Sequence, residues 1–208
     1  MGLYKTLNKA LKAPVEDVTT LKIKFKNQTL PLDVFSFIAL DTLFIQSDEL
    51  EYIPTQIENL KTLTQIHIQA PKLTEVPKEL LMLPQLRVLN LNNCAIKVLP
   101  AMIEENCAIE MLSMASNGLS EFPMNIEGLN NLTELNLAKN EITSLSEKIY
   151  FLEKLKRLNL NDNKLENFDL KLNALPNLKF VSLDRNKFSE EEKSRIQNEY
   201  GLWFEEFN

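Results

Sequence analysis

The sequence predicts an α/β solenoid, a fold built from stacked copies of one short structural unit. Two observations carry this prediction. A phrase of alternating apolar and polar residues returns every 23 residues along most of the chain. A proline follows several of these phrases and also returns every 23 residues. Because no such unit can bury its apolar side alone, neighbouring units must stack and share one continuous core.

The repeated phrase has the form L-x-x-L-x-L-x-x-N-x-L. Alternation at Leu135, Asn136 and Leu137 has the period of two that is typical of a β-strand. The phrase occurs seven times, without an insertion, beginning at Leu40, Leu63, Leu86, Ile109, Leu132, Leu155 and Leu178. A degenerate copy begins at Val18, so eight strands are expected.

The prolines mark where each unit must turn. Proline is excluded from a continuing sheet and from the interior of a helix, so the chain changes direction there. The column consists of Pro31, Pro54, Pro77, Pro100 and Pro123.

The two ends of the repeat array differ from its middle. Residues 1–17 are expected to form a helical N-terminal cap, because Leu3, Leu7 and Leu11 recur every four residues. Residues 18–39 form the degenerate first repeat, 40–188 hold seven units with the last one partial, and 189–208 form a C-terminal cap.

The C-terminal cap is expected to contain a helix. Ser189 and Glu192 have the spacing of a capping box, and Gly201 is a typical helix end. Five apolar side chains are expected to close the last repeat, although a terminal aromatic cluster could instead be a partner or dimer surface. They are Ile196, Tyr200, Trp203, Phe204 and Phe207.

Composition excludes several classes of protein. The chain has 208 residues and a net charge of −6, which argues against a general nucleic-acid binder. Residues 1–30 carry a net charge of +4, so the remainder is acidic. No apolar run is long enough to span a membrane, and the first residues lack the apolar core of a signal peptide. A cytoplasmic location is expected if Met1 is the native start, and a secreted or surface-anchored one if a signal peptide was removed.

Catalytic and metal-binding motifs are missing from the sequence. His67 is the one histidine, and neither triad spacing, a glycine-rich phosphate loop nor a metal-binding motif is present. The sequence therefore predicts no enzyme activity, cofactor or metal. Cys94 is expected to be an inert buried thiol, a disulfide with Cys107 is not expected, and the exposure of Cys107 is left open.

The phrase and the proline column together resemble leucine-rich repeat proteins of the 23-residue class, L-x-x-L-x-L-x-x-N-x-L-x-x-L-P-x-x-I-x-x-L. The resemblance covers about residues 18–188. It implies a right-handed, curved solenoid with a concave parallel β-sheet, an irregular or 3₁₀ convex side and helical caps at both ends. Without cysteine-rich flanks, the chain is more similar to bacterial and intracellular repeats than to animal ectodomains.

The asparagine position of the phrase is expected to face inward. There a carboxamide can donate to and accept from backbone groups where each strand ends, forming a structural ladder. The ladder residues are Cys94, Asn117, Asn140, Asn163 and Asn186; Asp48 and Pro71 occupy the same position in the first two units. Asn136, four residues before Asn140, is expected to face outward and to contact a partner.

Strand alternation places positions three, five, seven and eight of the phrase on the concave face. These positions are mostly neutral and polar, with apolar and aromatic exceptions, as in protein-binding patches. Single exposed apolar residues are also ordinary on any surface. The candidate binding face comprises Phe44, Gln65, His67, Val88, Asn90, Met111, Ser113, Glu134, Asn136, Arg157 and Asn159.

By resemblance, such repeats bind proteins or peptides on the concave sheet. The leading prediction is therefore a non-catalytic protein–protein interaction module, monomeric, with a protein or peptide partner and no nucleic-acid partner. A secreted or cell-surface bacterial recognition protein that binds a host protein or glycan is the alternative. A purely structural or self-associating solenoid is the third possibility.

Overall fold

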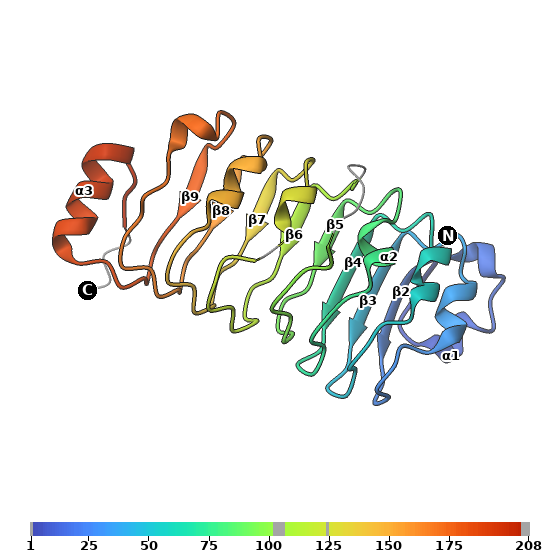
Figure 1. The fold of residues 1–208 in the computed structure, drawn as a ribbon. Coiled ribbons are helices and arrows are strands. Elements are labelled where there is room, and N and C mark those ends of the chain that lie inside the picture. The colour runs from blue at the N-terminus through green and yellow to red at the C-terminus, as the bar shows by residue number, and fades with distance from the viewer. Residues whose placement is uncertain (1, 102–106, 124, 205–208) are drawn as a thin grey trace.

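One open sheet of parallel strands runs the whole length of the molecule. The computed structural model describes residues 2–101, 107–123 and 125–204. The strands lie side by side in chain order (Figure 1). They are β1 (Gly2–Tyr4), β2 (Val18–Lys24), β3 (Thr42–Gln46), β4 (Gln65–Gln69), β5 (Val88–Asn90), β6 (Met111–Ser113), β7 (Glu134–Asn136), β8 (Arg157–Asn159) and β9 (Phe180–Ser182).

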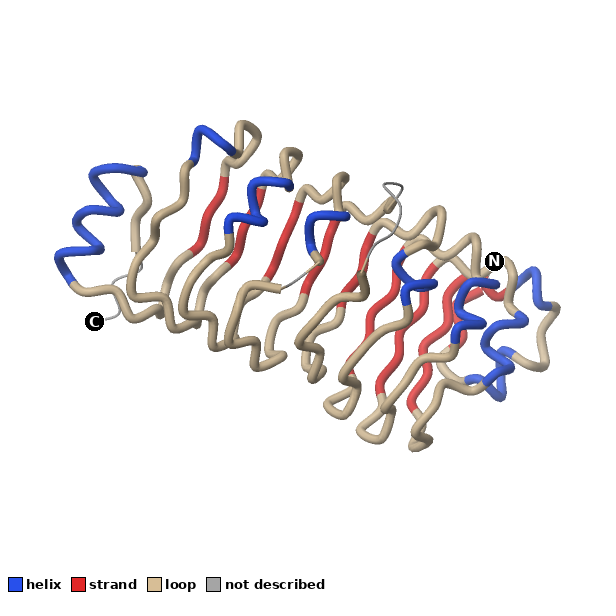
Figure 2. The backbone as a smooth tube through the Cα atoms, viewed as in Figure 1, coloured by secondary structure: helices blue, strands red, loops and turns tan. Residues whose placement is uncertain are grey.

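In the described residues, the return paths between strands are irregular and contain short turns of helix, in agreement with the expected irregular or 3₁₀ convex side (Figure 2). Pro31, Pro54 and Pro77 precede three of these turns, with φ angles of −57°, −61° and −69°. Proline suits a helix start because its φ is already helical. The turns are η2 (Leu32–Ser36), η3 (Thr55–Asn59), α2 (Lys78–Leu81), η4 (Ile126–Gly128), η5 (Glu147–Phe151) and η6 (Leu172–Ala174).

The core is a set of apolar columns shared by successive coils. Leu132, Leu135 and Leu137 are at most 1% exposed. Leu135 pairs in register with the leucines of the two neighbouring strands, Leu112 and Leu158, so each column continues from coil to coil. The leucines of the phrase therefore bury the apolar side of every unit against its neighbours.

The turn after each strand occurs in two forms. Strands β3 and β4 have five residues, whereas β5 to β9 have three. In the coils with short strands, position eight adopts a left-handed backbone, with φ between 55° and 58°. These residues are Asn93, Ser116, Lys139, Asp162 and Arg185.

The expectation that position eight always faces the open side is wrong in the first two units. Ser47 is 2% exposed there and Ala70 is fully buried. Asp48 and Pro71, at the ladder position, are exposed instead of facing inward. Without an inward Asn or Cys to hold a tight turn, the strand continues two residues further before the chain leaves the sheet.

The N-terminal cap differs from the predicted helix. Leu3 lies in β1, which pairs in parallel with β2, and only α1 (Leu7–Ala10) is helical, with η1 (Val15–Asp17) following it. Leu3 and Leu11 are 53% and 47% exposed, while Ala10 is buried. A strand forms because the edge of β2 offers unpaired backbone groups that an extended segment can satisfy. The sheet therefore has nine strands and not eight.

The C-terminal cap is built on α3 (Glu190–Tyr200), at the opposite end from α1 (Figure 1). The Ser189 hydroxyl accepts from the Glu192 backbone N–H at 3.1 Å, and Gly201 ends the helix with a φ of 66°. Ile196 is buried, but Trp203 is 84% exposed, so the prediction that Trp203 closes the last repeat is wrong.

Aromatic contacts complete this cap. The rings of Phe168 and Tyr200 meet edge to face at 5.4 Å, and those of Phe188 and Phe204 lie 5.8 Å apart. Phe207 lies outside the described residues. No helix in the described part of the chain is both long and apolar enough to cross a membrane.

Candidate functional site

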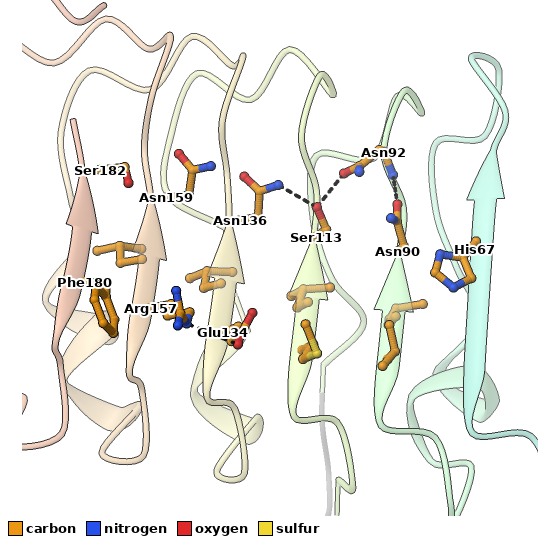
Figure 3. Close-up of a pocket in the computed structure, with 16 residues that line it drawn as sticks. His67, Asn90, Asn92, Ser113, Glu134, Asn136, Arg157, Asn159, Phe180 and Ser182 are labelled. Atoms are coloured by element: carbon orange, nitrogen blue, oxygen red, sulfur yellow. Dashed lines mark hydrogen bonds and ion pairs between the residues drawn. The ribbon is translucent and has the colours of Figure 1, made fainter. Parts of the chain in front are cut away.

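A groove of about 500 Å³ lies on the face of the sheet turned away from the irregular side, here called the open face (Figure 3). It extends over β4 to β9. Strand alternation forms it, because each buried leucine such as Leu112 is flanked by outward residues, here Met111 and Ser113. The side chains that line it from outward positions are His67, Val88, Asn90, Asn92, Met111, Ser113, Glu134, Asn136, Arg157, Asn159, Phe180 and Ser182.

The groove brings together most of the residues that the sequence singled out. Of the eleven candidates, Phe44 lines an adjoining hollow and Gln65 lines neither. Three further lining residues, Asn92, Phe180 and Ser182, are absent from the candidate set. Phe180, Ser182 and Asn92 occupy phrase positions three, five and seven, which strand alternation places on the open face. The repeat pattern alone could therefore have identified them.

Position three forms one row along the groove floor. Val88, Met111, Glu134, Arg157 and Phe180 follow one another in register on successive strands. Arg157 Nε lies 3.5 Å from Glu134 Oε1, and its guanidinium lies 4.3 Å from the centre of the Phe180 ring. An exposed ion pair contributes only about 0.2–1 kcal/mol to stability. Its main consequence is that the one arginine of the groove is held between an acid and an aromatic ring.

Position five forms a second row of amides and hydroxyls, and its asparagines bond to the backbone. The side-chain oxygens of Asn90, Asn136 and Asn159 accept from the N–H two residues further on, at 3.0–3.1 Å. These short local bonds hold each carboxamide at the end of its strand. The row therefore presents fixed polar groups to the groove.

Asn136 is less free than expected. Its amide nitrogen donates to Ser113 Oγ at 3.0 Å, and Ser113 Oγ in turn donates to Asn92 Oδ1 at 2.7 Å (Figure 3). An amide nitrogen has two N–H groups, so one remains for a ligand. Asn136 thus combines a structural role with a place on the groove wall.

The adjoining hollow, of about 340 Å³, lies over β2 to β5. The rings of Phe44 and His67 stack there, with centres 4.6 Å apart and planes at 9°. Lys22 Nζ lies 4.5 Å from the centre of the Phe44 ring. Partial burial and, to a smaller extent, the charge of Lys22 lower the pKa of His67 below 6.5. The imidazole is therefore harder to protonate than that of an ordinary histidine.

Replacing Lys22 with glutamine should raise the pKa of His67 toward its ordinary value, because it removes a neighbouring positive charge. The measurement is a ¹H NMR titration, which is unambiguous because the chain contains one histidine. Lys26→Gln, an exposed lysine outside the hollow, is the control and should leave the pKa unchanged. An equal pKa in wild type and Lys22→Gln would contradict the assignment of this charge as a cause.

The inward asparagines bond to the backbone of two successive coils. Asn140 Oδ1 accepts from the N–H groups of Asn117 and Leu119, at 2.9 and 3.1 Å. Its amide nitrogen donates to three carbonyls at 2.8–3.3 Å, those of Met114, Leu137 and Ala138. Asn117, Asn163 and Asn186 repeat this pattern at their own coils.

Neither cysteine offers a reactive thiol. Burial raises the pKa of Cys94 to about 11, and its sulfur lies 3.7 Å from the carbonyl oxygen of Ile68. Cys107 is 1% exposed, its thiol donates to the carbonyl of Leu81 at 3.3 Å, and burial raises its pKa as well. Both are free and buried, and because the thiolate is the nucleophile, their raised pKa values make them less reactive than an ordinary exposed thiol.

Among the described residues, no group of three or more His, Cys, Asp or Glu side chains could hold a metal ion. The open face offers hydrogen bonds, one ion pair and apolar contacts.

Comparison with solved structures identifies the fold as a leucine-rich repeat solenoid. The leucine-rich repeat protein LIC12759 of Leptospira interrogans superposes with a TM-score of 0.71 at 28% identity, covering 100% of this chain and 59% of that one. The chain thus spans less than two thirds of that protein. A TDR receptor superposes at 0.60 and 28% identity, covering 82% and 31% of the two chains. The leucine-rich repeat domain of the type III effector XopL superposes at 0.61 and 23% identity, covering 79% and 69%.

No protein-family model matches the chain, and no curated protein matches its sequence.

Proposed function

We propose that the chain is a non-catalytic protein–protein interaction module that binds a protein or peptide along the open face of its sheet. The observation that carries the proposal is the groove over β4 to β9. Amides held by backbone hydrogen bonds and two hydroxyls lie in one row, and the apolar or aromatic side chains of Val88, Met111 and Phe180 lie in the other. Methionine, arginine and aromatic anchors among polar groups are typical of protein interfaces.

The chemistry of the groove favours a neutral or mixed ligand over most of its length. Its one acid and one base, Glu134 and Arg157, neutralise each other. Met111 is 39% exposed and Phe180 is 53% exposed, so both are accessible as anchors. We also assign the repeats to the 23-residue class, on the constant spacing of the phrase.

Replacing Met111 with glutamate is expected to weaken partner binding by about thirtyfold, as loss of a central anchor does. The measurement uses the tagged chain as bait in an extract of its source, with bound proteins quantified for each variant. Met82→Glu is the matched control, because Met82 is 46% exposed but ends α2 on the irregular side. Partners should be retained by wild type and Met82→Glu and lost from Met111→Glu, with both variants unfolding at the wild-type temperature.

The opposite pattern would place the binding site elsewhere. If Met111→Glu retains every partner that wild type captures, the open face is not the site. If only Met82→Glu loses the partners, the irregular side is the binding site.

One observation favours a second candidate, a secreted or cell-surface bacterial recognition protein. The whole chain is similar to a protein of a bacterium, Leptospira interrogans, at 28% identity. N-terminal sequencing of the protein purified from its source would separate the two candidates, because a cleaved leader is required only by the second.

A further inference from the structure

Three lysines meet at the N-terminal end of the open face. Lys5, Lys22 and Lys24 line the hollow that contains the stacked Phe44 and His67. All three lysines are exposed, and no carboxylate lines the hollow in the part of the chain that the structure describes. Lys22 and Lys24 pair in register with Phe44 and Gln46, so the adjacent strand offers a ring and an amide. The hollow therefore carries an uncompensated positive charge.

Elsewhere in the molecule, some basic residues face an acid in the neighbouring repeat. In the described part of the chain, six such ion pairs join neighbouring coils: Glu49–Lys72, Arg87–Glu110, Glu127–Lys148, Glu134–Arg157, Glu141–Lys164 and Asp162–Arg185. Among the described residues, Lys5, Lys22 and Lys24 form no ion pair, although the chain has a net charge of −6. Clustered like charges on an acidic protein create a local positive potential that attracts an anionic group.

The hollow and the groove form one continuous surface. His67 and Asn90 line both of them. A segment that lies on the lysines can therefore continue over the amide row and reach Met111 and Phe180.

We propose that the hollow binds an acidic segment of the partner protein, with its carboxylates on Lys5, Lys22 and Lys24. This inference rests on the proposed function and adds an orientation to it. The acidic part of the partner lies over β2 and β3, and its neutral or apolar part lies over β5 to β9. The stacked rings of Phe44 on β3 and His67 on β4 form a flat surface where these two parts meet.

The remainder of the surface favours a protein over a nucleic acid. Nucleic-acid binding requires basic residues along the whole path of the strand. Beyond the hollow the groove offers one base, Arg157, and that residue is paired with Glu134. Phosphate recognition also favours arginine, and none lines the hollow.

The test uses an N-acetylated, C-amidated hexaglutamate peptide as the probe, followed through the NMR signal of His67. With the wild-type chain, the signal should shift saturably, and the pKa of His67 should rise as carboxylates offset the charge of Lys22. The triple variant Lys5→Gln, Lys22→Gln, Lys24→Gln should bind about tenfold more weakly, because each exposed charge contact contributes little alone. A second triple variant, Lys9→Gln, Lys12→Gln, Lys26→Gln, has the same net charge and alters exposed lysines outside the hollow. It should bind within about twofold of wild type.

Three outcomes would overturn the inference: no shift of His67 with hexaglutamate, equal weakening by both triple variants, or a shift with inorganic phosphate or hexathymidylate but not with hexaglutamate. Circular dichroism of each variant shows whether it is folded. Met82→Glu, on the irregular side, should bind hexaglutamate like wild type. Failure of this inference would appear in the hexaglutamate titrations, whereas failure of the proposed function would appear as retention of the natural partner by Met111→Glu.

Discussion

Replacing Asn140 with leucine should lower the free energy of unfolding by about 3 kcal/mol, although leucine is more hydrophobic and similar in size. The carboxamide of Asn140 is 7% exposed and bonds to two backbone N–H groups and three carbonyls. Leucine would leave these groups without a partner, and each buried unpaired group costs about 1–3 kcal/mol. Urea unfolding followed by circular dichroism measures the difference.

The control for this prediction occupies the same repeat position in the first full unit. Asp48 is exposed at the end of a five-residue strand. Asp48→Leu should therefore change the free energy of unfolding by less than about 0.5 kcal/mol. Equal effects of the two substitutions would mean that the inward carboxamides do not stabilise the solenoid.

Replacing Phe168 with alanine should cost about 4 kcal/mol and loosen the C-terminal cap. Phe168 is fully buried, and its ring meets Tyr200 edge to face. Its backbone N–H donates to Glu192 Oε1 at 2.9 Å, and its carbonyl accepts from Arg195 at 2.8 Å. The residue thus joins the last coils to α3 by both its ring and its backbone.

Phe151→Ala is the matched control for this second prediction, because that ring is 61% exposed on η5. It should cost less than about 1 kcal/mol. Hydrogen exchange should show the effect of Phe168→Ala first in β8, β9 and α3, since each repeat contacts only its neighbours. Uniform loss of protection from β2 to α3 would contradict this localised role.

The strands and the core could be predicted from the sequence because every column is repeated. An apolar residue at Leu135 is ambiguous alone, but the same position in the neighbouring units, Leu112 and Leu158, is also apolar and buried. The return path was predictable for a related reason, because proline excludes both a continuing strand and the interior of a helix there. The nine-stranded parallel sheet and the irregular side follow from these two columns, apart from the strand at the N-terminal edge.

The ends could not be predicted, because there the deciding contacts are not local. The spacing of Leu3, Leu7 and Leu11 suits a helix, yet the unpaired edge of β2 makes a strand of Gly2–Tyr4. Trp203 is apolar enough for a core, but Phe188 and Phe204 already pack together at this end. Neither the strand at Gly2–Tyr4 nor the exposure of Trp203 can be predicted without knowing the contacts made by the neighbouring coil.

The residues that lie at the candidate site could be predicted better than the hydrogen bonds among them. Alternation places Asn136 on the open face, and the structure has it there. Alternation does not show that its oxygen is held by Ala138 or that Ser113 receives its amide. The lysine hollow depends on Lys5, which lies outside the repeats and beside β2 only because β1 joins the sheet.

The pairing register has a consequence for how such a protein can evolve. From β3 onward, each strand residue pairs with the residue 23 positions later, as Leu43 does with Ile66 and Leu112 with Leu135. A gene duplication that adds one 23-residue repeat among β6 to β8 would therefore place the new strand between two strands that pair in the same register. It would lengthen the groove by about 4.8 Å, one strand spacing, and leave both ends unchanged. Between β2 and β3 the offset is 22, as for Lys22 and Phe44, so the same duplication there would separate the lysines from the ring. Duplication can thus vary the length of the groove while the lysine hollow stays constant.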